Sequence, residues 1–397
     1  MPPLFTVGIL GGGQLGRMMA LAARRLGCRV WTLAPEPDPP CAQAADGHIR
    51  AAFGDARAAL RLAARCDLLT CEFENIPAAV AEAVERSGKA VHPGGAALKT
   101  AQDRLLEKRF LRGLGIPVAD YREILRRKDL AAAAREIGFP AVLKTARGGY
   151  DGKGQAVVRG RGEAEAAFRT LGGAAGNALV WERLVPFARE IGVVCARNAA
   201  GALAVFPPAE NVHRGGILHL TLVPAGIPRG TEARLRALAR RIAGGLSLTG
   251  TFCVETFLLP DGKVLVNEIA PRPHNCGHYT LDACETSQFE QHMRAVCGLP
   301  LGSTRLLSPA AMVNILGTGA GDRLIGAAQA LADPAVKLHL YGKQEAHAGR
   351  KMGHLTALGG SAAAAARRAL AAHGKLAWAR AGGPGLSAPG TGDKEAA

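Results

Sequence analysis

The chain of 397 residues is 48% hydrophobic and 21% charged, which is enough for two or three domains with substantial cores. No apolar stretch approaches a membrane span and the N-terminus lacks a signal-peptide pattern, so we expect a cytoplasmic protein with no membrane contact. A net charge of +16 is a first sign of nucleic-acid binding, but only 5% of the residues are aromatic and the arginines are spread along alanine-rich segments. We therefore expect no nucleic-acid partner.

The N-terminal segment predicts a Rossmann-like parallel-sheet domain over residues 1–98. Residues 4–10 form an apolar strand pattern, the turn at 11–16 has the spacing G-x-G-x-x-G, and residues 14–26 have a helical pattern. Such a turn places the N-terminus of a helix where it can bind a phosphate group. The acid that would hold a dinucleotide's ribose is missing from the next predicted strand, 29–33, so a dinucleotide ligand is disfavoured.

Polar residues follow another strand pattern, 68–71, and a helix is expected to begin near Pro77. Residues at the carboxyl ends of strands face the ligand crevice of an open α/β sheet, so Glu74 is placed to contact a substrate. A helix-capping or solvated acid is an equally good interpretation of Glu74. Residues 99–112 predict a single charged helix.

A lysine and a glycine-rich turn follow the short strand pattern at 139–143. Lys144 stands where that strand ends, and the turn at 148–154 contains four glycines, whose backbone N–H groups can approach an anion closely. The arrangement is suited to holding the phosphates of a nucleotide. A glycine-rich β-hairpin without a ligand is the alternative.

Two carboxylates interrupt a predicted hairpin over residues 253–272, whose strands are joined by a Pro-Asp-Gly turn. Alternation along the strands places Glu255 and Glu268 on the same surface, and Asn267 lies beside Glu268. Acids in such apolar runs are costly unless a cation neutralises them, and oxygen ligands suit Mg²⁺. The alternative is a surface hairpin whose acids face water.

These features together resemble the ATP-grasp ligases, and further segments are similar to the N5-carboxyaminoimidazole ribonucleotide synthetase family. Those segments are 11–18, 71–77, 270–278, 341–343 and 349–354, and the resemblance runs in order from about residue 5 to about 358. It implies a mixed α/β and α+β architecture. In this architecture an ATP-grasp domain at 99–300, with a lid lobe at about 118–184, follows the N-terminal domain, and a small substrate-phosphate domain at 301–380 follows the ATP-grasp domain. Residues 381–397 are rich in alanine, glycine and proline and are expected to be disordered.

The resemblance implies a ligase that forms a C–N bond. Its members use Mg-ATP and bicarbonate to carboxylate 5-aminoimidazole ribonucleotide, through carboxyphosphate, in the biosynthesis of the purine nucleotide IMP, and they form homodimers. Another ATP-grasp purine enzyme, such as formate-dependent glycinamide ribonucleotide transformylase, is the nearer alternative. A non-catalytic nucleotide-binding protein is the other.

The resemblance also assigns residues to each ligand. ATP is expected at Arg104, Lys144, Gly149, Tyr150, Asp151, Gly152, Lys153, Gly154, Gln155, Glu182, Arg183, Leu184, Val185, Glu190, His213, Asn267 and Glu268. The aminoimidazole ribonucleotide is expected at Gln14, Leu15, Glu74, Asn75, Arg272, His274, Asn275, Lys343, Arg350 and Lys351. Catalytic roles fall to Tyr150, Lys153 and Arg272, and magnesium to Glu255 and Glu268. For Glu190 and His213, roles as a strand-face acid and a structural histidine stay open.

The cysteines carry one departure from the family pattern. The nine cysteines are scattered without a Cys-x-x-Cys pair, so we expect reduced thiols and neither a disulfide framework nor a zinc site. Cys276, however, lies where the family usually has serine. A thiol is the weaker hydrogen-bonding group, so we expect lower substrate affinity if this side chain contacts the substrate.

Overall fold

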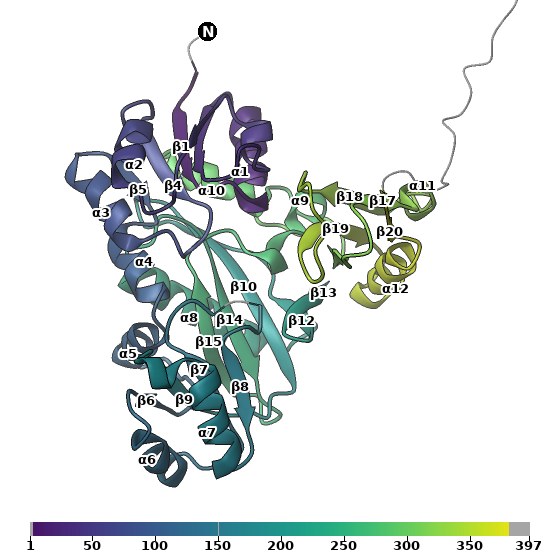
Figure 1. Ribbon diagram of the computed structural model, residues 1–397. Coiled ribbons are helices and arrows are strands. Elements are labelled where there is room, and N and C mark those ends of the chain that lie inside the picture. The colour runs from purple at the N-terminus through teal and green to yellow at the C-terminus, as the bar shows by residue number, and fades with distance from the viewer. Residues whose placement is uncertain (1–2, 150, 381–397) are drawn as a thin grey trace, which may run out of the picture.

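The computed structural model describes residues 3–149 and 151–380, which form three main sheets (Figure 1). In Figure 1 the N-terminal sheet lies at the top, the smallest lobe at the bottom, and the long strands β10, β14 and β15 run between them. The combination of a parallel sheet with helices and two largely antiparallel sheets confirms the expected α/β and α+β class. Within the described residues, the search for a helix of membrane-spanning length and apolarity finds none.

The N-terminal sheet has five parallel strands in the order β3-β2-β1-β4-β5, which confirms the Rossmann-like prediction. Its elements are β1 (Thr6–Leu10), α1 (Gln14–Arg25), β2 (Arg29–Ala34), η1 (Ala42–Ala44), β3 (Gly47–Arg50), α2 (Ala56–Ala63), β4 (Leu68–Cys71), α3 (Ala78–Arg86), β5 (Ala90–His92) and α4 (Gly95–Ala101). Helix α1 packs on one face of the sheet, and α2 and α3 pack on the other. The strand order reverses between β1 and β4, so the residues after these two strands face one crevice.

The smallest lobe has an antiparallel sheet in the order β6-β9-β7-β8. It comprises β6 (Tyr121–Ile124), α6 (Asp129–Glu136), β7 (Ala141–Thr145), β8 (Gln155–Val158), α7 (Arg161–Thr170), η2 (Gly173–Ala175) and β9 (Leu179–Arg183). Trp181 and Phe168 are buried between this sheet and its two α-helices. The lobe thus has its own small core, which holds β7 and the loop that follows it.

The largest sheet runs in the order β15-β14-β10-β12-β13-β16-β19-β18, with β11 paired to β10. Its strands are β10 (Arg189–Arg197), β11 (Leu203–Val205), β12 (Ala209–Arg214), β13 (Ile217–Val223), β14 (Gly250–Leu258), β15 (Val264–Ala270), β16 (Ala310–Leu316), β18 (Val336–Leu340) and β19 (Lys351–Leu358). The accompanying elements are α5 (Arg104–Gly113), α8 (Arg229–Gly245), η3 (Asn275–Gly277), α9 (Thr280–Ala283), α10 (Gln288–Val296), β17 (Arg323–Ile325), α11 (Ala327–Ala330), α12 (Ala362–His373) and β20 (Ala377–Ala379). Because β16 pairs with β13, this sheet continues across the domain boundary predicted near residue 300.

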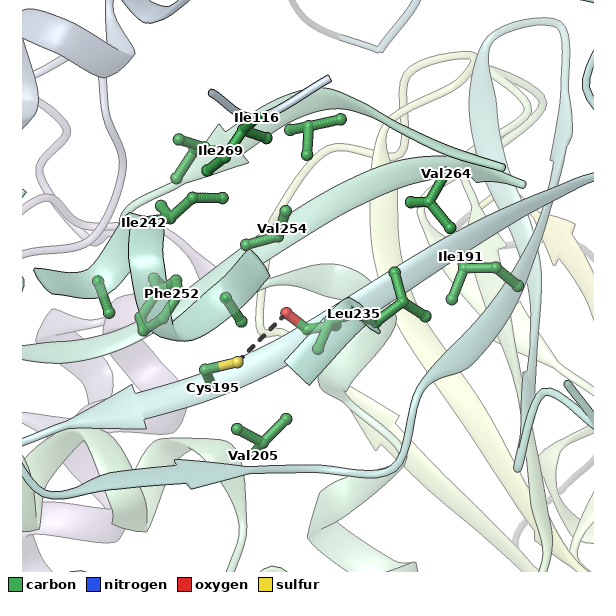
Figure 2. Close-up of a cluster of buried hydrophobic side chains, with 14 of the residues drawn as sticks. Ile116, Ile191, Cys195, Val205, Leu235, Ile242, Phe252, Val254, Val264 and Ile269 are labelled. Atoms are coloured by element: carbon green, nitrogen blue, oxygen red, sulfur yellow. Dashed lines mark hydrogen bonds between the residues drawn. The ribbon is translucent and has the colours of Figure 1, made fainter. Parts of the chain in front are cut away.

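A large hydrophobic cluster supports the strands that carry the predicted carboxylates. Leu235 and Ile242 of α8 pack against Phe252 and Val254 of β14, and Figure 2 shows how these side chains interleave. Each such fully buried side chain stabilises the fold by about 1.5 to 3 kcal/mol. Cys195 belongs to the same cluster, and its thiol donates to the carbonyl of Val193 at 3.8 Å. The packing of α8 against the β14–β15 hairpin therefore holds the hairpin in place.

The single helix predicted at 99–112 is wrong. Helix α4 ends at Ala101 and α5 begins at Arg104, with Asp103 extended between them. Its carboxylate accepts hydrogen bonds from the backbone N–H groups of Leu105 (2.9 Å) and Leu106 (3.3 Å). Asp103 thus acts as a helix cap, and the break turns Arg104 toward the large sheet.

Candidate functional site

A cavity of about 960 Å³ lies where the three sheets meet. Of the predicted site residues that the structure describes, all line this cavity except Gly154. Gly154 lies behind the glycine-rich loop, where an added Cβ would come within 2.7 Å of the Thr145 hydroxyl. Tyr150 lies outside the described residues. The sequence positions predicted for ATP, metal and substrate are therefore brought to one place.

Lys144 is held at the end of β7 by a buried carboxylate. Its Nζ lies 2.9 Å from Glu182 on β9, and Lys108 Nζ lies 3.2 Å from the other oxygen of the same carboxylate. Burial would raise the pKa of Glu182, but the two ammonium groups outweigh it and lower the pKa to about 2. The carboxylate of Glu182 is thus shared by two lysines. The three residues that follow Glu182, 183–185, also line the cavity.

The glycine-rich loop after β7 is packed against the rest of the site at two points. Gly152 has φ +75°, and a Cβ there would lie 2.9 Å from the backbone of Gly216, in the turn between β12 and β13. Asp151 accepts a hydrogen bond from Lys351 Nζ at 2.7 Å. The loop therefore bridges the smallest lobe and the C-terminal strand β19.

Glu255 and Glu268 lie directly opposite each other on β14 and β15. The register shifts next to this pair, so Asn267 is an extra residue on β15, and all three side chains line the cavity. The amide oxygen of Asn267 is buried without a hydrogen-bond partner in the described structure. Two carboxylates and an amide oxygen form a hard donor set, which fits Mg²⁺.

Each of these carboxylates also has a cationic neighbour. Arg104 lies 3.0 Å from Glu268, and His274 Nε2 lies 3.0 Å from Glu255. Burial would raise the pKa of Glu255, but the charge of His274 outweighs it and lowers the pKa to about 2. Glu255 is therefore ionised at neutral pH, as a metal ligand must be.

Glu190 and His213 form a pair on neighbouring strands. His213 Nδ1 contacts the carboxylate of Glu190. Burial lowers the pKa of His213, but the bond to Glu190 outweighs it and the pKa is raised. The pair presents one cation and one anion to the cavity. Their contact was not predicted from the sequence.

The opposite end of the cavity is rich in cations. Arg272 contacts Glu74 across the crevice. Burial would raise the pKa of Glu74, but Arg272 outweighs it and lowers the pKa to about 2. Lys343 Nζ donates to the carbonyl of Lys351 at 2.7 Å. The amide of Asn275 is engaged in two reciprocal bonds with Asn314, at 3.0 and 2.8 Å. Asn275 thus ties the site to β16.

Sequence reasoning missed two buried acids. Glu72 follows β4, contacts the backbone N–H of Gly13 and lines the cavity, and burial raises its pKa to about 7. Its position at the end of a strand was the signal that pointed to Glu74. Glu107 accepts a bond from the N–H of Ile269 at 2.6 Å, and burial together with Glu268 raises its pKa to about 8. It looked like one of several charges on a helix, and nothing in the sequence set it apart.

The thiol of Cys276 points away from the cavity. It is fully buried, and its Sγ lies 3.1 Å from His274 Nδ1 and 3.5 Å from Cys253 Sγ. Cys276 is not among the residues that line the cavity, and its nearest link to the cavity is the contact with His274. Lower substrate affinity stays a prediction.

Comparisons with known proteins agree with this arrangement. Family models match in chain order: a ribonucleotide synthetase preATP-grasp domain at residues 4–102, an ATP-grasp domain at 109–289, and a phosphoribosylaminoimidazole carboxylase C-terminal domain at 310–368. A relative from Bacillus subtilis, named N5-carboxyaminoimidazole ribonucleotide synthase, is 44% identical over 89% of this chain and 91% of its own.

Solved structures give the same result. A crystal structure of the ADP complex of N5-carboxyaminoimidazole ribonucleotide synthetase is 44% identical, with a TM-score of 0.87 over 94% of this chain and 97% of its own. A synthase from Aspergillus clavatus, in complex with ADP and 5-aminoimidazole ribonucleotide, is 32% identical, with a TM-score of 0.85 over 93% of this chain and 98% of its own. On these grounds the chain belongs to the N5-carboxyaminoimidazole ribonucleotide synthase family of ATP-grasp enzymes.

Proposed function

We propose that the protein uses ATP and bicarbonate to convert 5-aminoimidazole ribonucleotide into N5-carboxyaminoimidazole ribonucleotide, with release of ADP and phosphate, in purine biosynthesis. One observation carries the assignment: in a chain of this family, Lys144, the paired carboxylates Glu255 and Glu268, and the cations Arg272 and Lys351 line one cavity. The cavity of about 960 Å³ is roomy enough for two nucleotides at once.

At the ATP end, we assign Lys144 to the phosphate oxygens, because its ammonium is held in place by Glu182 and lines the cavity. The glycine-rich loop would close over the phosphates, and Lys153 would place a positive charge on bicarbonate or on the carboxylated intermediate. Tyr150 is assigned the same task by the resemblance alone. Magnesium would be held by Glu255 and Glu268, and it would neutralise the charge that develops during phosphoryl transfer.

The chemistry proposed for the transfer has two steps. An oxygen of bicarbonate attacks the terminal phosphorus of ATP, ADP leaves, and carboxyphosphate forms. The amine of the aminoimidazole then attacks the carboxyl carbon, phosphate leaves, and the new C–N bond is made. Carboxyphosphate is labile in water, so closure of the loop over the site would protect it.

At the ribonucleotide end, we assign Arg272 to the reacting substrate and Lys343, Arg350 and Lys351 to its phosphate. Arginine and lysine near a buried anion site offer charge-assisted hydrogen bonds. Burial and the neighbouring Arg350 lower the pKa of Lys343 to about 8, so an anion bound beside Lys343 would stabilise its charged form. We further propose that the enzyme works in the cytoplasm as a homodimer, as the family resemblance implies.

The test is ADP release by the purified protein with ATP, Mg²⁺ and bicarbonate, with and without 5-aminoimidazole ribonucleotide. Glycinamide ribonucleotide with formate serves as the comparison pair. Release that depends on the aminoimidazole substrate, and that falls sharply in Lys144→Ala and Glu268→Ala, supports the proposal. Release with the glycinamide pair alone would instead make the protein a transformylase, and no release with either pair would refute the catalytic role.

A further inference from the structure

A cluster of soft ligand atoms lies directly behind the predicted magnesium carboxylates. Cys253 Sγ, Cys276 Sγ and one ring nitrogen of His274 all lie within 4.8 Å of one another. Two of the separations are 3.5 Å, between the sulfurs, and 3.1 Å, between Cys276 Sγ and His274 Nδ1. Cys253 lies on β14, two residues before Glu255, while His274 caps η3 and Cys276 lies within η3.

These separations are close to those in a tetrahedral metal site. Ligand distances of about 2.3 Å for sulfur and 2.0 Å for nitrogen place two sulfurs about 3.8 Å apart and a sulfur and a nitrogen about 3.5 Å apart. The observed separations are a few tenths of an ångström shorter. Three protein ligands leave one position for water, an arrangement that proteins use for Zn²⁺.

The ring of His274 is oriented as metal-binding histidines usually are. Its Nε2 faces Glu255 at 3.0 Å, and its Nδ1 accepts the backbone N–H of Cys276 at 3.5 Å. Such carboxylate partners are typical behind zinc ligands. Nδ1, 3.1 Å from Cys276 Sγ, is then the nitrogen that an ion would bind, after it displaces the proton that His274 carries there as a cation.

We infer that Cys253, His274 and Cys276 form a binding site for a soft or borderline divalent ion such as Zn²⁺, coupled through His274 to Glu255. The site differs in chemistry from the hard oxygen donors of the cavity, because thiolate and imidazole favour zinc over magnesium. Access is through the cavity, which His274 lines. An ion on Nδ1 fixes the ring of His274 against Glu255, so the carboxylate oxygen that contacts Nε2 is less free to bind magnesium.

Cobalt(II), which absorbs light when bound to thiolate, is a direct probe of this site. We expect the reduced, metal-free protein to bind one Co²⁺ per chain with thiolate-to-cobalt charge-transfer absorption in the near ultraviolet. Cys253→Ser and Cys276→Ser should each lose about half of that absorption or more, because each removes one of the two thiolates. Cys195→Ser is the matched control, since Cys195 is equally buried on the neighbouring strand β10 but belongs to the cluster of Figure 2.

A second measurement does not depend on any variant. X-ray absorption at the zinc edge of the wild-type protein with one equivalent of Zn²⁺ should show two sulfur neighbours and nitrogen or oxygen for the remainder. No charge-transfer absorption in the wild type, absorption that is unchanged in both cysteine variants, or a zinc shell without sulfur would each overturn the site.

The coupling to Glu255 is measured with Mn²⁺ in place of Mg²⁺, because electron paramagnetic resonance gives the concentration of free Mn²⁺. Zinc loading should weaken Mn²⁺ binding several-fold in the wild type and in Cys195→Ser, but not in Cys276→Ser. Equal Mn²⁺ affinity with and without zinc would refute the coupling. These readouts use no turnover, so they are independent of whether the proposed carboxylation is correct.

Discussion

The shared carboxylate of Glu182 offers the sharpest test of how the ATP end of the site is built. In Glu182→Gln, one neutral amide replaces the anion that pairs with both Lys144 and Lys108. The side chains are 4%, 10% and 2% exposed, respectively, so the two ammonium groups would remain buried without a counter-charge. Removing one partner of a buried ion pair typically costs about 3 to 5 kcal/mol.

The pKa values give a similar magnitude. The pKa of Glu182 falls from 4.5 to about 2 in the folded protein, which corresponds to about 3 kcal/mol of stabilisation. Because the folded value is the lower one, this stabilisation is present above pH 4.5 and is lost as the pH falls toward 2. Burial, together with Lys108 and Arg104, lowers the pKa of Lys144 despite Glu182, so repulsion among the cations offsets part of the gain. We therefore expect a loss near the lower end, about 3 kcal/mol.

Hydrogen–deuterium exchange of β9 measures this loss where it occurs. A fall of about 3 kcal/mol in the free energy of opening speeds exchange on the order of a hundredfold. The control is Asp120→Asn, which breaks an ion pair of the same N···O distance, 2.9 Å, between Arg183 and Asp120 side chains that are 49% and 60% exposed. An exposed pair is worth less than about 1 kcal/mol. If the two variants exchange at similar rates, burial is not what makes the Glu182 pair strong.

Three further results are expected. Burial lowers the pKa of His292 from 6.5 to about 3, so the stability of the wild type should fall as the pH falls below 6.5. Urea denaturation at pH 7 and at pH 5.5 should show that His292→Gln loses about 1.3 kcal/mol less stability between these two pH values than wild type, and equal losses would contradict this. Gly152→Ala should weaken ATP binding several-fold more than Gly148→Ala, because both glycines have positive φ but only Gly152 lies against the Gly216 backbone. Calorimetry measures the two affinities, and equal values would refute the role of that contact. Arg272→Lys, which loses the planar fork, should lower kcat/KM for the aminoimidazole ribonucleotide by about tenfold or more with the KM for ATP little changed, and steady-state kinetics showing the reverse pattern would place Arg272 at ATP.

The features that sequence predicted well are local ones. The Pro-Asp-Gly turn and the alternation are enough to bring Glu255 and Glu268 into one hairpin. The register that starts at the turn would set Glu255 opposite Asn267, and a bulge brings Glu268 to that position. Contacts between segments that are distant in the sequence were not predicted. The charge pair of Lys144 with Glu182 depends on which strands pair in the smallest sheet, and that of Arg272 with Glu74 depends on how two sheets dock.

The errors have similar causes. The helix predicted at 99–112 failed because the capping role of Asp103 looked like one more helical charge. Asn267 and Glu268 both line the cavity only because the strand bulges there, and alternation alone would turn one of these two neighbours away. The position of Cys276 behind His274 could not be read from a run of five residues, since it depends on the contact with Cys253 on β14.

The most direct test of the account follows the atoms of bicarbonate. The purified protein is incubated with ATP, Mg²⁺, 5-aminoimidazole ribonucleotide and bicarbonate labelled with both ¹³C and ¹⁸O. Carboxylation through carboxyphosphate predicts a ¹³C carbamate on the ribonucleotide and one bicarbonate ¹⁸O in each phosphate released. Phosphate that carries only solvent oxygen, with no ¹³C on the ribonucleotide, would show that the cavity hydrolyses ATP without carboxylating and would contradict the proposed function.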